Sequence, residues 1–476
     1  MIRDKITEYF SAHREEMLGR LAALCRIPSV EGEPEAGKPF GAEIDRALAL
    51  AEAMFREEGF PTERAPGGEY VLASFGEGER TVGIFAHADV VPAGEGWSVT
   101  APFFPCEHEG LFVARGAEDN KAGIVAALYL LKAVRELALP VEARLLVFVG
   151  GNEETGMRDV MAFRRDRGAP DVSLVPDNDP PLIIGEKGRM VGWLTSPSVL
   201  RTVLAFESGT AYNMVPDRAT ATLADDEGVF CALSALIKAR HELSLTREEG
   251  VLRLSAVGQA AHAADPADSK NAAAVLCEAL SSCEVLTPEE RREMTVAARF
   301  LSDSFGGTLG IADVDGPFGR RTAVSGVACM REGRLCLSLD IRYGSATSGE
   351  ALSVLLSDTV RCEGWEFRPE SIEDSFDHGD SDPLALALLS SYRRVTGEGN
   401  AVANRSGGGT YARHLPRAFS MGLAVNTVRP LQRDVLRPGH GDPHCPDEGL
   451  PVASYLAALR VLTEYVMTVS DFLANE

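Results

Sequence analysis

Five short polar stretches follow apolar runs in this chain, and each contains side chains that can bind a metal ion. The stretches contain His87 with Asp89, Asp119, Glu153 with Glu154, Asp177, and His444. Imidazole nitrogens and carboxylate oxygens are ligands for zinc, manganese and cobalt ions. Strands of an α/β sheet deliver the residues that follow them to one edge, so these side chains can meet there. The pattern predicts a hydrolytic site with two metal ions.

Three of the stretches also have simpler explanations when each is taken alone. His87 and Asp89 are two residues apart, so in an extended segment the carboxylate can orient the imidazole, as partners of metal-bound histidines do. His87 can equally be a hydrogen-bonded histidine at a strand end, Asp119 a helix cap, and Asp177 a turn residue beside prolines. None of these stretches alone decides between the two explanations.

Of the remaining two stretches, the glutamate pair strengthens the metal hypothesis. Glu153 and Glu154 follow a buried strand and two glycines, where adjacent negative charges are unfavourable unless cations compensate them. A solvated loop is the alternative for this pair, and a surface loop leading into the last helix is the alternative for His444. The joint pattern favours a metal site, in which one carboxylate must bridge two ions.

A second set of polar residues lies in the middle of the chain. Asn213 occurs in YNMVPD, His262 in AAHAADP and Arg342 in LDIRYG, and Arg342 could bind a substrate carboxylate through both of its terminal nitrogens. The alternatives are a turn residue, a loop histidine and an exposed strand charge. The run Gly407–Gly409 suits close approach of the backbone to a ligand or a flexible turn, and it lacks the form of a phosphate loop.

Composition restricts the partners and the setting. The chain has 476 residues with a net charge of −23, which opposes binding to nucleic acid or to an anionic membrane and favours small-molecule partners. Its nine cysteines include no CxxC pair, which indicates reduced thiols and a cytosolic protein. The charged N-terminal segment and the lack of an apolar run approaching ~20 residues predict neither export nor membrane insertion.

Elements that could position these residues alternate in the α/β manner at both ends of the chain. The apolar patterns predict helices at 6–25, 42–58, 121–137 and 383–395 and from about 452, and strands at 70–75, 81–85, 111–114, 143–149, 172–175 and 418–423. The middle instead predicts alternating strands at 219–223, 251–257 and 334–343, with helices near 229–242, 271–283 and 350–362. We expect a discontinuous catalytic domain, 1–186 and 385–476, interrupted by an inserted α+β domain, 187–384.

The ordered series of motifs resembles the M20 family of metallopeptidases, and within it the dipeptidase branch. The motifs are HADVVPAGEGW, RGAEDNKAG, NEETG, PDNDPPLIIGEKG, NMVPD, AAHAADP, IRYG, GGGTYAR and HCPDE. The resemblance implies an α/β fold with a zinc-exopeptidase-like catalytic domain, a mixed sheet and an inserted α+β lid domain.

The resemblance also implies a set of ligands for two divalent ions, zinc or alternatively manganese or cobalt. In that set Asp119 bridges the ions, His87 and Asp177 complete one site, and Glu154 and His444 complete the other. Asp89 would support His87. The peptide bond between Asp119 and Asn120 is expected to be cis.

The same resemblance implies roles around the substrate. Glu153 would be the general base for a water activated by the ions, and His262 would stabilise the oxyanion. The residues implied to hold the substrate's C-terminal carboxylate are Asn213, Arg342, Gly408, Thr410 and Arg413. The chain departs from the common family pattern at Asn120, Lys270 and Cys445, which affects expectations of substrate preference and metal affinity but removes no ligand.

Our hypothesis from the sequence is a cytosolic, metal-dependent dipeptidase that acts on short unblocked peptides. We expect a monomer, with a dimer left open, and no nucleic-acid or membrane partner. The alternatives are an M20 amidohydrolase or carboxypeptidase acting on N-acylated amino acids, and a catalytically silent peptide-binding homologue.

Overall fold

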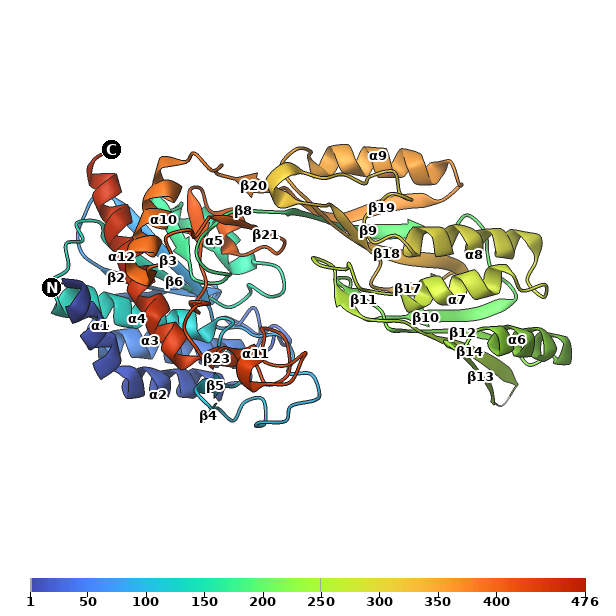
Figure 1. Cartoon of the computed structure of the whole chain (residues 1–476), viewed down its shortest axis with the longest axis horizontal. Helices are drawn as coiled ribbons and strands as arrows, with labels where there is room; N and C mark the ends of the chain where they lie inside the picture. The colour runs from blue at the N-terminus through green and yellow to red at the C-terminus, as the bar shows by residue number, and fades with distance from the viewer. Residues whose placement is uncertain (1, 249) are drawn as a thin grey trace. The chain divides into compact units, whose positions relative to one another are not determined.

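In the computed structural model, residues 2–248 and 250–476 are described, and they form two compact units (Figure 1). Unit 1 comprises 1–185, 378–404 and 409–476, and unit 2 comprises 186–377 and 405–408. The predicted α/β class with an inserted α+β region is confirmed.

Unit 1 contains a mixed sheet and the helices that pack around it. Its helices are α1 (Ile2–Ala12), α2 (Arg14–Cys25), α3 (Ala42–Glu57), α4 (Lys121–Glu136), α5 (Arg158–Arg167), α10 (Pro383–Thr396), α11 (Gln432–Val435), α12 (Val452–Ala474) and the 3-10 helix η2 (Tyr411–His414). Its strands are β1 (Thr62–Arg64), β2 (Tyr70–Phe75), β3 (Thr81–His87), β4 (Cys106–His108), β5 (Leu111–Val113), β6 (Arg144–Gly150), β7 (Val172–Val175), β8 (Ile183–Glu186), β22 (Ala418–Ser420) and β23 (Gly449–Pro451).

The main sheet of unit 1 runs in the order β1-β2-β6-β3-β7-β22-β8. The central pairs β6–β3, β3–β7 and β7–β22 are parallel, and the flanking pairs β2–β6 and β22–β8 are antiparallel. Helices α3, α4 and α12 share one apolar core with these strands. The central strands are buried on both faces, as parallel strands usually are. Aromatic residues that include Phe163 of α5 cover the face of the sheet opposite to this core.

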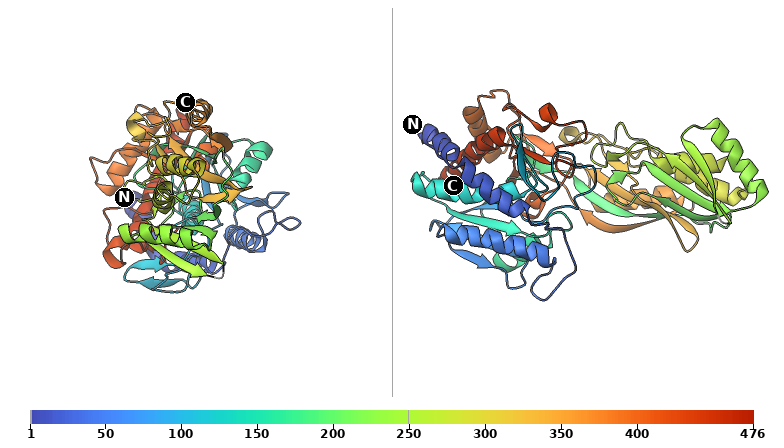
Figure 2. Two further views of the ribbon diagram at one scale, coloured as in Figure 1. Left: turned by 90° about the vertical axis from the view of Figure 1, so that its right-hand side faces the viewer. Right: turned by 90° about the horizontal axis from the view of Figure 1, so that it is seen from below.

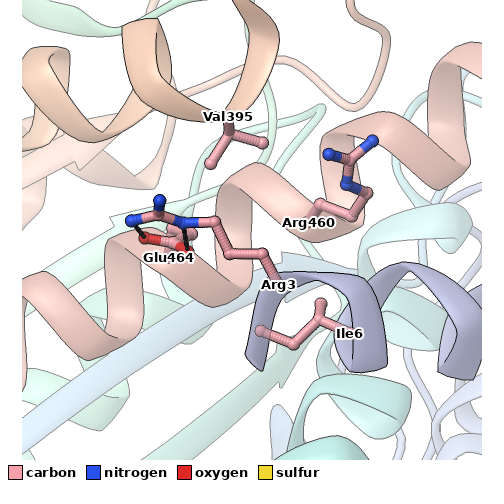
Figure 3. A pocket seen from close by; sticks show the side chains of 5 residues that line it. All are labelled: Arg3, Ile6, Val395, Arg460 and Glu464. Carbon is pink, nitrogen blue, oxygen red and sulfur yellow. Dashed lines mark hydrogen bonds and ion pairs between the residues drawn. The ribbon is translucent and has the colours of Figure 1, made fainter. Parts of the chain in front are cut away.

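The first predicted helix is two helices, so the expectation of one helix over 6–25 is wrong. The break lies at His13, between α1 and α2, where the ring Nδ1 lies 2.8 Å from the main-chain oxygen of Tyr9. Figure 3 shows how α1 is then held on α12: Arg3 donates to Glu464, with Nε 2.6 Å from Oε1, beside a hollow that Val395 and Arg460 also line. The two ends of unit 1 are thereby joined.

Helix α12 is the only described helix that is long and apolar enough to cross a membrane. In this structure 67% of its apolar window is buried within the protein, where it packs on α4 and α10. A core helix passes the same test of length and composition.

Unit 2 is an antiparallel sheet with its helices on one face (Figure 2). Its strands are β9 (Gly188–Thr195), β10 (Val203–Ser208), β11 (Met214–Val215), β12 (Arg218–Ala224), β13 (Leu243–Glu248), β14 (Val251–Val257), β15 (Ala261–His262), β16 (Thr322–Val324), β17 (Ala328–Arg331), β18 (Arg334–Tyr343) and β19 (Glu366–Glu373). Its helices are α6 (Glu227–Ala239), α7 (Ala272–Ser281), α8 (Pro288–Leu301), α9 (Gly349–Arg361) and the 3-10 helix η1 (Gly316–Phe318). The short strands β20 (Phe376–Asp377) and β21 (Asn404–Ser406) lie where the chain passes between the units.

Candidate metal centre

The parallel strands β3, β6 and β7 of unit 1 place three of the predicted ligand segments at one edge of the sheet. His87 is the last residue of β3, and its register partner on β6 is Gly150, so residues 151–154 leave the sheet beside it. On the other side of β3, strand β7 ends at Val175, two residues before Asp177. The carboxyl ends of parallel strands thus bring these segments together, as expected.

His87, Asp119 and Asp177 form the first group of potential ligands, called the His87 group below. Nε2 of His87 lies 3.0 Å from Oδ1 of Asp119 and 3.4 Å from Oδ2 of Asp177. The other ring nitrogen, Nδ1, lies 3.0 Å from the main-chain oxygen of Asp89 and 3.4 Å from its carboxylate. The nearest partner of the imidazole is therefore the Asp89 carbonyl, whereas the sequence had pointed to the carboxylate.

Asp119, Glu154 and His444 form the second group, called the His444 group. Nε2 of His444 lies 3.0 Å from Oδ2 of Asp119 and 3.1 Å from Oε2 of Glu154. Asp119 thus directs one oxygen to each imidazole, which is the arrangement of a bridging carboxylate. The peptide bond between Asp119 and Asn120 is cis, as expected.

The spacing of these atoms suits metal ions. Two ligand atoms about 2.0–2.1 Å from a tetrahedral zinc ion lie roughly 3.3 Å apart. The four distances from the two imidazoles to carboxylate oxygens range from 3.0 to 3.4 Å. Each group also combines one nitrogen donor with two carboxylates, a set that fits zinc, manganese or cobalt.

The ionisable groups of this cluster shift one another's pKa values. Partial desolvation opposes a charged imidazole at His444, but its hydrogen bonds to Asp119 and Glu154 raise the pKa of His444 to about 11. Burial of Asp119 favours its neutral form, yet hydrogen bonds from His444 and His87 lower the pKa of Asp119. Burial and the charge of Asp119 raise the pKa of Glu154 to about 7. The cluster thus favours positive charge among its carboxylates, which bound cations would also supply.

Glu153 is placed beside both groups by the main chain of its turn. The N–H groups of Glu153 and Glu154 donate to the two oxygens of Asp89, over 3.2 and 3.0 Å. Burial raises the pKa of Glu153 well above its usual value, and the charges of Asp177 and Glu154 raise it further against the influence of His87. A carboxyl group of raised pKa can accept and return a proton, which is what a general base and acid must do.

Sequence reasoning missed the pair formed by Arg115 and Glu448, each about 1% exposed. Glu448 accepts hydrogen bonds from Arg115 over 2.7 Å and from the main-chain N–H groups of Gly116, Glu118 and Asp119, over 3.0, 2.9 and 3.1 Å. Arg115 also donates to the main-chain oxygen of His444 over 3.2 Å. One buried ion pair therefore holds the segments that carry Asp119 and the exposed His444.

Thr410 and Arg413, predicted to bind substrate, lie in unit 1 after the glycine run. Thr410 caps η2 by accepting the N–H of Ala412, and its hydroxyl lies 3.2 Å from that of Ser420. A Cβ added to Gly409 would lie 1.7 Å from Nη2 of Arg413, so a larger residue here would displace the guanidinium from its present position. The glycine run thus permits a close approach, although here it is to a side chain of the same chain.

Asn213, His262, Arg342 and Gly408 belong to unit 2. The pairing of β11 with β15 places Nδ2 of Asn213 3.4 Å from Nε2 of His262. Arg342 is buried and donates through Nε to Asp340 over 2.6 Å, so it is not the exposed strand charge that the sequence left open. Its Nη1 also lies 3.4 Å from the main-chain oxygen of Gly407.

Comparison with known proteins gives consistent relatives. The sequence profile described as Peptidase family M20/M25/M40 matches residues 83–468. A Bacillus subtilis protein named "Putative dipeptidase YtjP" is 31% identical over 86% of this chain and 90% of its own length. A Staphylococcus aureus protein of similar name, MW1694, is 27% identical over 90% of this chain and 93% of its own length. The crystal structure of human carnosine dipeptidase 1 shares the fold, with a TM-score of 0.60 at 16% identity over 99% of each chain.

Proposed function

Because this chain belongs to peptidase family M20/M25/M40, we propose that it is a metal-dependent dipeptidase, which hydrolyses the peptide bond of short, unblocked peptides. The observation that carries the proposal is the sharing of Asp119 by two groups of ligands beside the buried carboxyl group of Glu153. The names of the bacterial relatives support the choice of dipeptides.

The proposed cofactors are two divalent ions, one in each group. Zinc is the first choice, because an imidazole with two carboxylates suits it, and manganese and cobalt are the alternatives. When bound, such ions polarise a carbonyl group and lower the pKa of water. Elemental analysis of protein purified without added metal, followed by reconstitution with each ion, identifies the active form.

Glu153 supplies the proton transfers in this proposal. Its carboxylate takes a proton from the attacking water and returns it to the amine that leaves, while Asp89 holds the main chain of the turn in place. Asp119 keeps both imidazoles oriented through its two oxygens. The contributions of Asn213, His262, Arg342, Gly408, Thr410 and Arg413 to substrate binding remain predictions.

A substrate panel tests the proposal. Metal-loaded protein is incubated with dipeptides, tripeptides and N-acylated amino acids, and released amino acids are quantified. Glu153→Gln protein, purified in parallel, controls for contaminating host peptidases. We expect hydrolysis of dipeptides above all. Hydrolysis of the acylated compounds alone would establish the amidohydrolase or carboxypeptidase alternative, and binding without turnover would establish the silent homologue.

We further propose a monomeric, cytosolic enzyme with no nucleic-acid or membrane partner. All nine cysteines are unpaired, which fits a reducing compartment. Light scattering of the purified protein measures its mass, and fractionation of the source cells locates it. A stable dimer, or recovery in a membrane or secreted fraction, would contradict this part of the proposal.

A further inference from the structure

Two buried carboxylates hold the turn that carries Glu153 and Glu154. The N–H groups of residues 151 and 152 donate to Oδ2 of Asp159 over 2.7 and 2.8 Å, and those of residues 153 and 154 donate to Asp89. Four successive amides are thus bonded to carboxylates. Asp89 also contacts His87. Among the described residues, the side chain of Asp159 makes no hydrogen bond to the side chain of a potential metal ligand.

Asp159, near the start of α5, has a fourth and distant donor. It is fully buried, and besides the two amides of the turn it accepts the N–H of Val160 over 2.7 Å and the hydroxyl of Tyr411 over 2.5 Å. Burial and the charge of Asp89 raise the pKa of Asp159 to about 6, against the influence of these donors. The Tyr411 hydroxyl therefore stabilises the charged form, which is the better acceptor for the amides of the turn.

Tyr411 reaches Asp159 from the segment that follows the glycine run. It comes directly after Thr410, and its ring is in a T-shaped contact with the His87 ring, with centroids 6.3 Å apart at 90°. A Cβ on Gly150 would lie 1.9 Å from Oη of Tyr411 and 2.2 Å from Oδ2 of Asp159. Glycine at the end of β6 is therefore what allows the tyrosine to reach the turn.

We propose that Tyr411 and Asp159 act as one pair of positioning residues that fixes the turn carrying the base, Glu153. The effect on rate rests on the proposed function, whereas the effect on the turn does not. Without the hydroxyl, Asp159 keeps three donors and its negative charge is less well stabilised. The first half of the turn is then held less firmly, and the carboxyl group of Glu153 loses its alignment.

The test compares Tyr411→Phe, Asp159→Asn and the double variant with the metal-loaded parent enzyme. We expect each single variant to lower kcat about 10- to 100-fold, the range seen when outer partners of metal sites are lost, with KM changed less than about threefold. We expect the double variant to resemble the single variants, because residues that act as one unit are not additive. Additive losses, or a loss confined to KM, would overturn the proposal.

The matched control is Tyr9→Phe. Tyr9 is also a buried tyrosine of unit 1 that donates to a carboxylate, Glu136, over 3.1 Å, but it lies on α1 away from the sheet edge. This variant should retain the parent kcat. An equal fall of kcat in Tyr9→Phe would attribute the loss to general destabilisation and overturn the proposal.

Hydrogen exchange provides a readout that is independent of turnover. In Tyr411→Phe, amides 151–154 should exchange faster than in the parent, while peptides from α4 and α12 keep their protection. Unchanged exchange in the turn would overturn the proposal even if kcat fell. If the parent hydrolyses no dipeptide, the proposed function fails, and the exchange measurement still decides whether the pair holds the turn. Tyr411→Phe and Tyr9→Phe suffice for that decision if Asp159→Asn does not fold.

Discussion

The His87 group and the His444 group share Asp119 but are built on different kinds of structure. His87 ends a central strand, and its side chain is 0% exposed, whereas the side chain of His444 lies on a loop and is 48% exposed. His444 also has a φ of 66°, in the left-handed region that residues other than glycine adopt at a cost of about 1–3 kcal/mol. The His87 imidazole is thus positioned by the sheet, whereas the position of the His444 imidazole depends on the contacts that its loop makes.

This difference leads to an expectation about the two ions. Strand register places His87 and the segment of Asp177, so an ion proposed there would bind side chains that have little freedom to lose. The His444 site depends on the contacts of Arg115 with the His444 carbonyl and of Asp447 with Ser98, which can be removed without touching a ligand. We expect the ion of the His444 group to exchange faster and to be lost first.

The largest effect is expected from Asp119→Ala, because it removes a ligand from both groups. Both ions should be lost and dipeptide hydrolysis should fall to background, as measured by elemental analysis and product release. Asp171→Ala is the matched control: Asp171 is an aspartate at the opposite end of β7, where it accepts the N–H of Thr81 over 2.7 Å. Retention of one ion in Asp119→Ala would show that the two groups are independent.

Glu153→Gln should separate chemistry from metal binding. We expect kcat to fall about 10²- to 10⁴-fold, the usual contribution of a general base, because the amide cannot accept the proton. Both ions should remain, since Glu153 belongs to neither group. Loss of an ion from this variant would make Glu153 a ligand instead of a base.

His87→Ala and His444→Ala compare the two groups directly. Each should weaken binding of one ion by more than about 100-fold, since loss of an outer partner alone weakens it about 10- to 100-fold. In His444→Ala the ion of the His87 group should remain. His87→Ala should also disturb Asp89 and, through it, the hydrogen bond that Asp89 accepts from the N–H of Glu154. Titration calorimetry measures both affinities, and equal retention in the two variants would remove the distinction between the groups.

The free energy of unfolding of the metal-free protein should depend on pH partly through Glu154. Its pKa is about 7 in the folded protein, above the unfolded value of 4.5, so the folded state binds more protons between these pH values. Its contribution to stability is therefore fully present below pH 4.5 and is lost as pH rises through 7. In chelator, the difference in unfolding free energy between the parent and Glu154→Gln should change over this window, as measured by urea denaturation. A difference that is constant with pH would contradict the raised pKa.

The sequence predicted those parts of the molecule that local patterns determine. The strands 70–75, 172–175, 251–257 and 334–343 agree with β2, β7, β14 and β18, because continuous or alternating apolar runs specify them. The strand predicted at 418–423 ends at Ser420, and the helix predicted at 6–25 breaks at His13. In both places the apolar pattern indicates the type of element and does not place its end.

The site was predictable to the same extent. Of its potential ligands, His87, Glu154 and Asp177 follow strands of the main sheet and could be proposed from that position, whereas His444 lies on a loop. The partners that hold these residues could not be found from the sequence. Arg115 and Glu448 are 333 residues apart, and Tyr411 and Asp159 are 252 apart, so only the folded chain pairs them. Each of these residues alone has the pattern of an ordinary surface charge or loop aromatic.

The smallest effect is expected from Asp447→Asn, which should act mainly on the loop that carries His444. Asp447 accepts the N–H groups of Ser98 and Val99 and the hydroxyl of Ser98 over 2.8, 2.9 and 2.6 Å, and its Oδ2 lies 2.8 Å from Nδ1 of His440. Although burial opposes it, the hydrogen bonds from Ser98, Val99 and His440 lower the pKa of Asp447 to about 2.

Because this folded pKa lies below the unfolded value of 3.8, the carboxylate stabilises the protein above pH 3.8, and this contribution is lost as pH falls through 2. Asp447→Asn should lower the unfolding free energy by about 1–3 kcal/mol above pH 4, the usual cost of leaving buried polar partners unsatisfied, and the difference from the parent should narrow below that pH. At neutral pH the variant should bind the ion of the His444 group about 10-fold more weakly and leave the His87 group unchanged. If both ions weaken equally in calorimetry, the loop is not what distinguishes the two groups, and the difference between them must lie in their ligands.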